Sequence, residues 1–535
     1  MILAALLLVA AAATFGGTNK TEEGSQGVKP GAGPAWKKDT SPITFDVYFN
    51  ASWFAEPWGK GDTTTAYITK KTGVSINYIA PTGNEAEKVN TMIASGTLPD
   101  FFMVAWYDAG YRQAIEGRLV LPLNKLADQY DPWFYEVHPQ SIRGWYTMDD
   151  GNIYAIPNFA YPPEKATGNV KMYSNKTFLV RKDMYEALGK PDMRTPEGFL
   201  AALKAAKEKY PTVNGQPLIA FGCHEFTDAG NDSFQGFLQD QLAIARAADG
   251  KLYDRFSSPE YLRWMKTFRK ANEMGLIAKD IFIDKRAQMS EKMAQGRYFA
   301  MMYQWTDLQT ENQNRYNSDP NSVYIAVDGP RSAKLAAPTL AGSGGLAGWE
   351  VTMISSKVKN AARAIAFLDY LFSPEGQQDQ YLGEKGVTWD TIDGRDQIKP
   401  DILALQQSDK NAFRAKYLCA GELWTWFDPY SAAKWEFAAL PPNDQPKLWT
   451  TKYSVSVAAF DDLDPAAGSA EGVIQKKISD KWGVLLPQLI LAKSDAEFDT
   501  LWNGWIAERK ALGWDNLIAF QQARYQDHVK KLGLK

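Results

Sequence analysis

The first well-patterned stretch of this sequence alternates between two hydrophobic periodicities, and this alternation restricts the fold more than any other feature. Apolar residues at every second position predict strands at 43–49 and 74–78, and the apolar run at 98–106 predicts a third. Asp62 and Asn84 precede helical patterns between these strands. Strand–helix–strand–helix–strand at this spacing predicts a parallel sheet with right-handed crossovers, so the fold class is α/β.

The length of the chain predicts more than one such unit. A single hydrophobic core stops growing at roughly 250–300 residues, whereas this chain has 535. Three further helices are predicted by a shared start of hydroxyl residue, Pro and Glu, at Thr195, Ser258 and Ser373. In this pattern the hydroxyl caps free amides, Pro needs no amide partner, and Glu lies at the positive helix end. We therefore expect two α/β lobes with many helices.

The N-terminal residues differ from the rest of the chain. Residues 2–13 form an uninterrupted apolar run. This run is shorter than the about 20 residues that span a bilayer, and it fits the core of a secretory signal. The residues that follow are rich in Gly, Thr and Ser, which is typical of a flexible tether. We expect residues 1–40 to be a signal-like segment and tether, and the protein to be exported.

Charge and motif content exclude several classes of function. The 59 Lys and Arg against 62 Asp and Glu give a net charge of −3, so the basic footprint of a nucleic-acid or polybasic membrane-surface protein is missing. The sequence contains no GxSxG, HExxH, GxxxxGK[ST] or GxGxxG motif. No metal ligand or cofactor is expected, while a pair of carboxylates for glycoside hydrolysis stays open at this point, because only the fold brings such a pair together. Cys223 and Cys419 lack a CxxC spacing and are predicted to be buried, inert thiols.

Aromatic residues are unusually frequent, with 18 Trp, 25 Tyr and 26 Phe making up 13% of the chain. Flat aromatic faces can stack on the apolar faces of sugar rings. Trp53, Trp106 and Trp305 each follow a predicted strand, and ligands of open α/β sheets bind beyond the carboxyl ends of strands. These positions favour a sugar-stacking platform. The alternative is core packing, which we expect for Trp502 and Trp505 because they lie within a helical pattern.

A family resemblance rests on several segments in a fixed order. They read LPDFFMV, GRLVLPLNKLAD, DGNIYAIPN, FLVRKDMYEALGKPDMRTPEGFLAALKAAKEKYP and GWEVTMISSKVKNAARAIAFLDYLFSPEGQQDQYLGEKGVTW. In these the chain resembles the family 1 extracellular solute-binding proteins of bacterial ABC sugar importers, especially their large lipoprotein-type members. The resemblance implies a two-lobe, periplasmic-binding-protein-like fold of class II type, with a hinge and an interlobe cleft that closes on a sugar.

The resemblance also implies where the chain passes between the lobes. The first crossing is expected near Phe159 and the return near Val323–Asp328. The first lobe would then comprise residues 41–160 and 325–375, and the second lobe residues 161–324 and 376–535.

Position by position, the resemblance implies a set of ligand contacts. Tryptophans would stack on the sugar, Asp100 and Glu350 would accept hydrogen bonds from its hydroxyls, and the remaining polar residues would face the cleft. The expected ligand-binding residues are Trp53, Asp100, Trp106, Tyr161, His224, Trp305, Trp349, Glu350, Trp389 and Trp424. Some large relatives hold calcium in an acidic loop, but residues 207–225 carry no acidic cluster at that place, so no calcium is expected.

The same resemblance implies the partners and the location. A monomer would carry a carbohydrate, expected to be an oligosaccharide, to the membrane subunits of an ABC permease at the outer face of the cytoplasmic membrane, without covalent chemistry. The lipid-anchoring Cys of the lipoprotein members is missing from TFGGTNKT at 14–21. Two alternatives remain open from the sequence. One is a secreted carbohydrate-active enzyme, and the other is the same fold binding a non-sugar solute.

Overall fold

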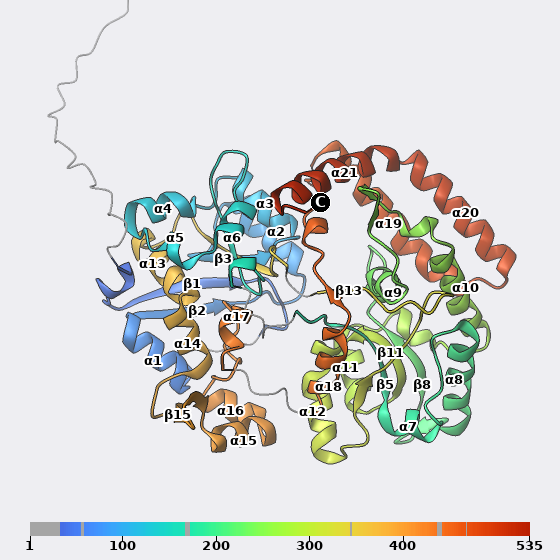
Figure 1. The fold of residues 1–535 in the computed structure, drawn as a ribbon. Coiled ribbons are helices and arrows are strands. Elements are labelled where there is room, and N and C mark those ends of the chain that lie inside the picture. Colours follow the sequence, from blue (N-terminus) through green and yellow to red (C-terminus); the bar gives the residue numbers. More distant parts are fainter. Residues whose placement is uncertain are drawn as a thin grey trace, which may run out of the picture.

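The computed structural model describes residues 33–54, 58–165, 172–342, 345–435, 441–466 and 468–534 (Figure 1). The signal-like segment expected at the N-terminus lies almost entirely outside these residues. The chain forms two α/β lobes, each built on its own sheet and its own hydrophobic core. The predicted α/β class is confirmed.

The first lobe is built on a five-stranded sheet in the order β2-β1-β3-β14-β4. Strand β1 runs parallel to β2 and β3, while β14 is antiparallel to β3 and β4. The strands are β1 (Ile43–Phe49), β2 (Val74–Ile79), β3 (Phe101–Ala105), β4 (Ile156–Pro157) and β14 (Glu350–Ile354). The helices are α1 (Thr63–Thr72), α2 (Glu85–Ser95), α3 (Ala109–Glu116), α4 (Leu123–Tyr130), α5 (Phe134–Val137), α6 (Gln140–Trp145), α13 (Ala361–Phe372) and α14 (Pro374–Leu382).

The local signals read from the sequence explain why these elements form. Asp62 accepts a hydrogen bond from the amide of Thr65 at 2.7 Å and so caps α1. Asn84 caps α2 in the same way. Both helices end at a glycine in the left-handed conformation, Gly73 and Gly96, which satisfies their last carbonyls. The strands and helices predicted for this region are therefore confirmed.

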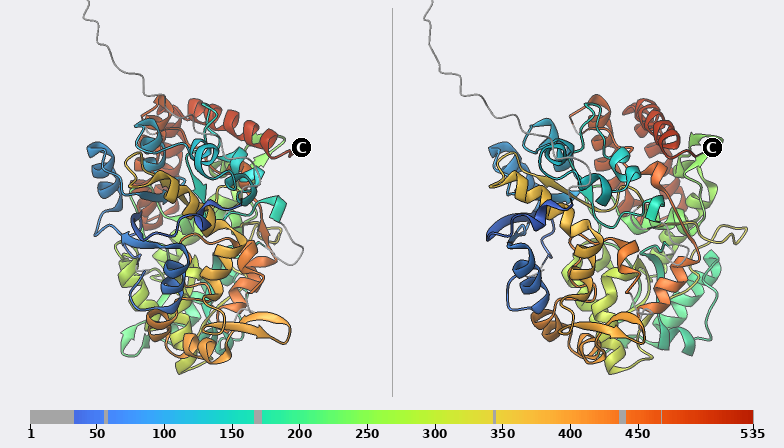
Figure 2. Two further views of the ribbon diagram at one scale, coloured as in Figure 1. Left: turned by 90° about the vertical axis from the view of Figure 1, so that its left-hand side faces the viewer. Right: turned by 60° about the vertical axis from the view of Figure 1, so that its left-hand side comes forward.

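The second lobe is built on a four-stranded sheet in the order β12-β5-β11-β8. Its strands are β5 (Lys176–Arg181), β8 (Ile219–Cys223), β11 (Tyr298–Gln304) and β12 (Tyr324–Ala326). Its helices are α7 (Lys182–Ala187), α8 (Pro196–Lys209), α9 (Gly236–Gln241), α10 (Pro259–Glu273), α11 (Arg286–Ala294), α12 (Gln309–Ser318), α18 (Asp444–Thr451), α19 (Ala470–Leu491), α20 (Asp495–Ala511) and α21 (Trp514–Lys531). Helices α19–α21 lie together at the upper end of the molecule in every view (Figure 2).

Short two-stranded ribbons complete the fold. They pair β6 (Thr212–Val213) with β7 (Gln216–Pro217), β9 (Ala247–Ala248) with β10 (Lys251–Leu252), β13 (Leu340–Ala341) with β17 (Ser454–Val455), and β15 (Trp389–Ile392) with β16 (Arg395–Ile398). Of the three helix starts predicted from hydroxyl–Pro–Glu, Thr195 and Ser373 cap α8 and α14. Ser258 precedes α10 without a side-chain cap.

The crossing from the first lobe to the second centres on Asn158, which is fully buried. The backbone amide of Asn158 donates to the carbonyl of Glu350, and its side-chain Oδ1 accepts from the backbone amide of Glu350 at 2.8 Å. Its Nδ2 donates to the carbonyl of Thr425 at 2.8 Å. One side chain therefore ties the first crossing to β14 and to a third segment far along the chain.

The return crossing lies later than the sequence indicated. Strand β12 belongs to the second sheet, and residues up to β13 still contact the second lobe, where the amide of Thr339 donates to Asp240. The chain re-enters the first lobe between β13 and β14, where Leu346 packs in the first core. The boundary expected at 324/325 would cut through β12. The structure places the boundary about 20 residues later, between β13 and β14.

Residues 376–432 also belong with the first lobe, although the sequence assigned them to the second. Trp426 is fully buried in the first core, and its Nε1 donates to Oγ1 of Thr352 in β14 at 3.1 Å. The helices involved are α15 (Pro400–Ser408), α16 (Lys410–Lys416) and α17 (Pro429–Ala432). The chain passes to the second lobe again before α18, where Gln445 hydrogen-bonds the backbone of Ala326 in both directions.

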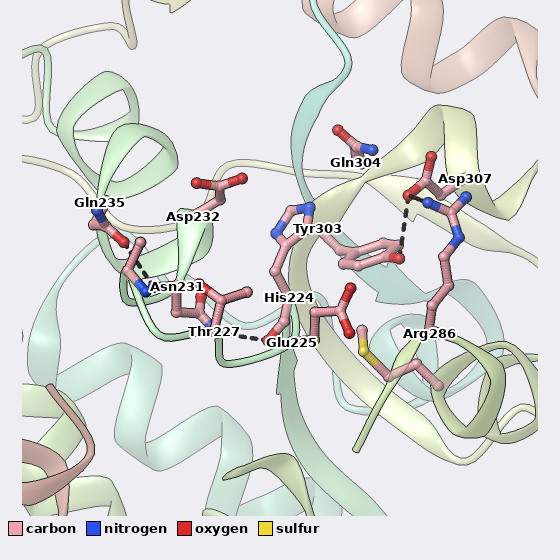
Figure 3. Close-up of a pocket in the computed structure, with 12 residues that line it drawn as sticks. His224, Glu225, Thr227, Asn231, Asp232, Gln235, Arg286, Tyr303, Gln304 and Asp307 are labelled. Atoms are coloured by element: carbon pink, nitrogen blue, oxygen red, sulfur yellow. Dashed lines mark hydrogen bonds and ion pairs between the residues drawn. The ribbon is translucent and has the colours of Figure 1, made fainter. Parts of the chain in front are cut away.

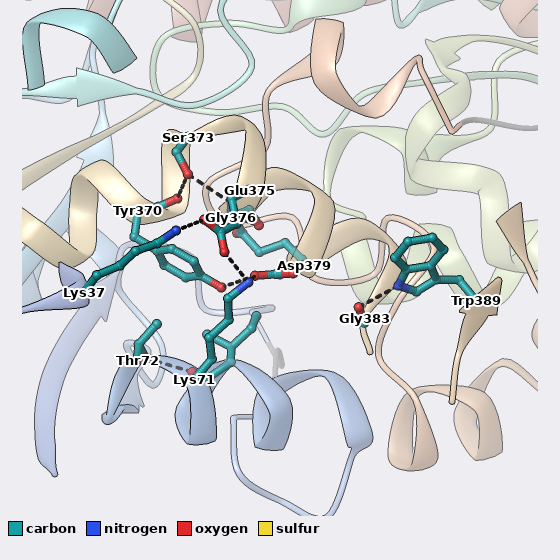
Figure 4. A network of polar contacts seen from close by, with 12 residues as sticks. Lys37, Lys71, Thr72, Tyr370, Ser373, Glu375, Gly376, Asp379, Gly383 and Trp389 are labelled. Carbon is teal, nitrogen blue, oxygen red and sulfur yellow. Dashed lines mark hydrogen bonds and ion pairs between the residues drawn. The ribbon is translucent and has the colours of Figure 1, made fainter. Parts of the chain in front are cut away.

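The folded part also begins before residue 41. Trp36 is 5% exposed and packs in the core of the first lobe. Beside it, Lys37 pairs with Glu375 at 2.9 Å, while Lys71 pairs with Glu375 at 2.7 Å and with Asp379 at 2.6 Å (Figure 4). The last residues of the expected tether are therefore fixed on α14.

The C-terminal helix reaches back to the first lobe. Asp462 accepts ion pairs from Arg112 of α3 at 2.6 Å and from Arg524 of α21 at 2.8 Å. The ring of His528 lies 4.6 Å from that of Trp145. These contacts give the two lobes a second junction, away from Asn158.

Two remaining expectations concern thiols and membrane segments. Cys223 and Cys419 are buried and unpaired, one in each lobe, as predicted. Among the helices of the described residues, none combines the length and the apolar character that a membrane crossing needs.

Asn158→Ala should lower the free energy of unfolding by about 2–5 kcal/mol, because it leaves the amide of Glu350 and the carbonyl of Thr425 buried without partners. Denaturant titration of the variant measures this loss. Asn77→Ala is the matched control, since Asn77 makes one exposed hydrogen bond, to Asp46. Equal stability of the Asn158 and Asn77 variants would contradict the role given to Asn158.

Candidate functional site

Three tryptophans from separate parts of the chain meet at one edge of the first sheet. Trp53 follows β1, Trp349 precedes β14, and Trp424 follows α16. Their ring centroids lie 6.1 Å apart for Trp53–Trp349, 6.0 Å for Trp53–Trp424 and 5.7 Å for Trp349–Trp424, with interplanar angles of 1–24°. Phe49 and Phe54 pack edge-on against Trp424. We call Trp53, Trp349 and Trp424 the tryptophan platform.

The spacing of the platform determines how it can hold a flat ligand. Apolar atoms make contact at about 3.5–4.0 Å, so a ring held between two indoles needs them about 7–8 Å apart. The platform rings are closer than this, and a ligand must therefore stack on an outer face. Trp53 is 49% exposed, which makes it the accessible member.

Acidic side chains lie beside the platform. Glu350, the first residue of β14, is 3% exposed, and its Oε2 has no hydrogen-bond partner within the described part of the chain. Burial, together with the carboxylates of Asp108 and Glu85, raises the pKa of Glu350 well above its usual value. Burial also raises the pKa of Asp108, which accepts from Asn50 at 2.8 Å. A buried carboxyl with a free oxygen suits a ligand that donates hydrogen bonds.

The second lobe contributes a polar pocket of about 280 Å³ (Figure 3). Its lining includes the carboxylates of Glu225, Asp232 and Asp307, and the guanidinium of Arg286. Arg286 pairs with Asp307 at 2.8 Å, and the hydroxyl of Tyr303 donates to Asp307 at 3.2 Å. The pocket is therefore rich in hydrogen-bonding groups that are held by one another.

His224 lies in the middle of this lining (Figure 3). Its Nδ1 is 2.8 Å from Oγ of Ser233, and its ring lies 4.4 Å from that of Tyr303 and 4.7 Å from that of Phe237. Burial lowers the pKa of His224 to about 3, so the imidazole is neutral near pH 7. It can both donate and accept, and it adds no positive charge.

Two observations show that the platform and the pocket face each other. The guanidinium of Arg286 lies 5.7 Å from the ring centroid of Trp53, which joins the second lobe to the first. Tyr107 follows Trp106 in the first lobe and is 63% exposed. The charged groups that act on its hydroxyl include Glu350 of the first lobe and Asp232 of the second. Groups of both lobes therefore converge on one site.

Comparison with known families agrees with this architecture. The family described as "Bacterial extracellular solute-binding protein" matches residues 64–388, which is 325 of the 535 residues. The chain belongs to this family. The predicted relationship and the two-lobe, periplasmic-binding-protein-like fold are confirmed. Members of the family are solute-binding proteins rather than enzymes.

Individual relatives of this solute-binding protein are distant in sequence. The fructooligosaccharide ABC transporter substrate-binding protein FusA of Streptococcus pneumoniae serotype 4 is 24% identical over 330 residues, which cover 57% of each chain. The match thus spans less than two thirds of that relative. The structure of FusA in complex with kestose has a TM-score of 0.65 at 19% identity, covering 91% of this chain and 99% of FusA. That of alginate-binding protein AlgQ2 without calcium ion has a TM-score of 0.63 at 20% identity, covering 91% and 98%.

The structure brings several of the predicted residues of this solute-binding protein together. Trp53, Trp349 and Trp424 form the platform, Glu350 lies beside it, and His224 lines the facing pocket. Trp106 packs edge-to-face on Tyr107, and its Nε1 donates to the carbonyl of Gly348 at 3.2 Å. It borders the site with its indole nitrogen already bonded.

Asp100 and Trp389 do not join the site. Asp100 precedes β3, at the opposite end of the strand from Trp106, and its carboxylate accepts from the amides of Asp46 and Lys359, both at 2.9 Å. It fixes the start of β3. Trp389 packs in a separate hydrophobic cluster around β15 and β16, where its Nε1 donates to the carbonyl of Gly383 at 2.9 Å (Figure 4).

Trp305 and Tyr161 are likewise engaged in packing. Trp305 is 5% exposed, and its Nε1 donates to the carbonyl of Ser174 at 2.8 Å, so the indole points into a core of the second lobe rather than into the pocket. Tyr161 is 8% exposed and lies edge-on against Tyr430 at 5.7 Å. A strand end places a residue near the binding edge, but it does not decide which way the side chain points.

Sequence reasoning missed Tyr107 and Arg286. Tyr107 follows Trp106 directly, and the alternation of side chains along an extended segment signals that one of the two turns outward. Arg286 carried no signal, because its place over Trp53 depends on how the lobes face each other.

Glu350→Gln should make the protein more stable at neutral pH. A raised pKa means that the folded state keeps a proton that the unfolded chain loses above its ordinary pKa of about 4.3. Wild-type stability therefore falls, relative to the variant, as pH rises from about 4 toward the folded-state pKa, by up to about 1.4 kcal/mol per pH unit. Denaturant titrations of both proteins from pH 4 to 8 measure the difference, and parallel curves would contradict the burial of an unpaired carboxyl.

Proposed function

We propose that this solute-binding protein captures an oligosaccharide between its lobes and delivers it to the membrane subunits of an ABC permease. The observation that carries the proposal is the tryptophan platform of one lobe facing the polar pocket of the other. Sugars have apolar ring faces and hydroxyl edges, so they match an apolar surface opposite hydrogen-bonding groups.

The proposed ligand contacts follow from the geometry of the site. A sugar ring stacks on the exposed face of Trp53, and this requires Arg286 to move aside from its place over the indole. The free Oε2 of Glu350 accepts from a hydroxyl, and Tyr107 bonds a second one. His224 and its neighbours bond the sugar from the second lobe. Closing the lobes about the Asn158 junction completes these contacts.

Similarity to FusA, a fructooligosaccharide ABC transporter substrate-binding protein, supports this proposal. We propose further that binding involves no bond cleavage, and that the protein acts as a monomer, exported to the outer face of the cytoplasmic membrane.

A thermal-shift screen tests the function. A ligand at 100 times its Kd adds about 2.7 kcal/mol to the free energy of unfolding, so a bound sugar raises the melting temperature. We expect at least one neutral oligosaccharide, with kestose and the trisaccharides of glucose, mannose and galactose as the first panel, to raise it without being cleaved. Release of smaller sugars would instead indicate an enzyme, and the absence of a shift with every sugar would remove the proposal.

Trp53→Ala and Trp349→Ala should each weaken the affinity for the sugar found in that screen by about tenfold or more, which is about 1.4 kcal/mol. Each removes part of the surface on which the ring stacks. Titration calorimetry measures the change. Trp514→Ala is the matched control, because Trp514 packs on Arg509 in the C-terminal helices. An unchanged affinity in both platform variants would rule out stacking there.

A further inference from the structure

The charged groups around the proposed site are mostly acidic. In the described lining of the pocket, Glu225, Asp232 and Asp307 stand against one cation, Arg286. His224 adds no charge near neutral pH. On the platform side, burial and then the carboxylates of Asp108 and Glu85 raise the pKa of Glu350.

Arg286 already has partners within the protein. Its Nη1 lies 2.8 Å from Oδ2 of Asp307, and its guanidinium stands 5.7 Å from the ring centroid of Trp53. Figure 3 shows Arg286 and Asp307 joined on one side of the pocket, with Asp232 on the other side of His224. A ligand carboxylate would have to compete with Asp307 for the one cation of this lining.

The buried oxygen of Glu350 points to the chemistry of the ligand. Its side chain is 97% buried, since 3% is exposed, and Oε2 finds no partner in the described part of the chain. A sugar hydroxyl can satisfy this oxygen wherever the proton of the carboxyl lies, because a hydroxyl both donates and accepts.

Resting on the proposed function, we infer that this site selects uncharged sugars and rejects sugars that carry carboxylates, with Asp307 acting as the specificity determinant that keeps Arg286 from binding an acidic sugar. At an effective dielectric constant of about 20, two like charges within about 8 Å weaken binding by more than tenfold. Several carboxylates at such a site therefore exclude uronates while leaving hydroxyl recognition intact.

Matched sugars separate charge from shape. The probes are the neutral trisaccharides of glucose, mannose and galactose together with kestose, and the trisaccharides of glucuronic, mannuronic and galacturonic acid. Calorimetric titration of the full chain gives an affinity for each. We expect binding among the neutral sugars and at least tenfold weaker binding of every uronate.

The variant Asp307→Asn tests whether Asp307 keeps Arg286 from binding an acidic sugar. The asparagine keeps an acceptor for Tyr303 but frees Arg286, so the ratio of the affinity for a uronate trisaccharide to that for its neutral counterpart should rise at least tenfold. Glu208→Gln is the control, because it removes one charge from α8 at a side chain that is 66% exposed. It should change neither affinity.

The outcomes are distinct. Uronates binding the wild type as tightly as neutral sugars would overturn the inference and leave the proposed function standing. An Asp307→Asn variant whose ratio of uronate affinity to neutral-sugar affinity stays at the wild-type value would overturn the role of Asp307. Failure of every neutral and acidic trisaccharide to bind would overturn the proposed function itself.

Discussion

The arrangement of this protein depends on the hydrogen bonds of the buried Asn158 side chain. Its side chain bonds the amide of Glu350 and the carbonyl of Thr425, so three passages of the chain are fixed at one point. Trp349 directly precedes Glu350, and Trp424 directly precedes Thr425. The junction between the lobes and the tryptophan platform are thus built on the same hydrogen bonds. A hinge placed here can change the angle between the lobes while the platform stays intact.

The acidic groups of the candidate site lower the stability of the fold. A buried carboxyl without a partner opposes folding, and Glu350 lies beside the further carboxylates of Asp108 and Glu85. The protein keeps this arrangement at the candidate site, whereas at the far end of β3 the carboxylate of Asp100 is paired with two backbone amides and with the ammonium of Lys359. Unsatisfied polar groups where a ligand fits, and satisfied ones elsewhere, are what a preformed binding site requires.

Local sequence signals predicted much of the fold because they depend on residues a few positions apart. The caps at Asp62, Asn84 and Thr195 and the alternation of β1 were all readable in this way. The lobe assignment of 376–432 was not, because α14 to α17 carry the pattern of helices that could cover either core. Burial of Trp426 against β14 assigns these residues to the first lobe. The spacing of apolar residues in the sequence does not indicate this contact.

The sequence by itself determined the α/β class, the two lobes and the family, and it predicted the sheet edge at which the candidate site lies, since strand ends and helix starts are local properties. Only the tertiary structure decided which aromatic side chains meet there. It turned Trp305 and Trp389 into cores, joined Trp53 to Trp424, and brought Arg286 over Trp53 from the other lobe. The physical reason is that contacts between residues hundreds of positions apart are set by how whole elements pack, and a chain carries no local record of that packing.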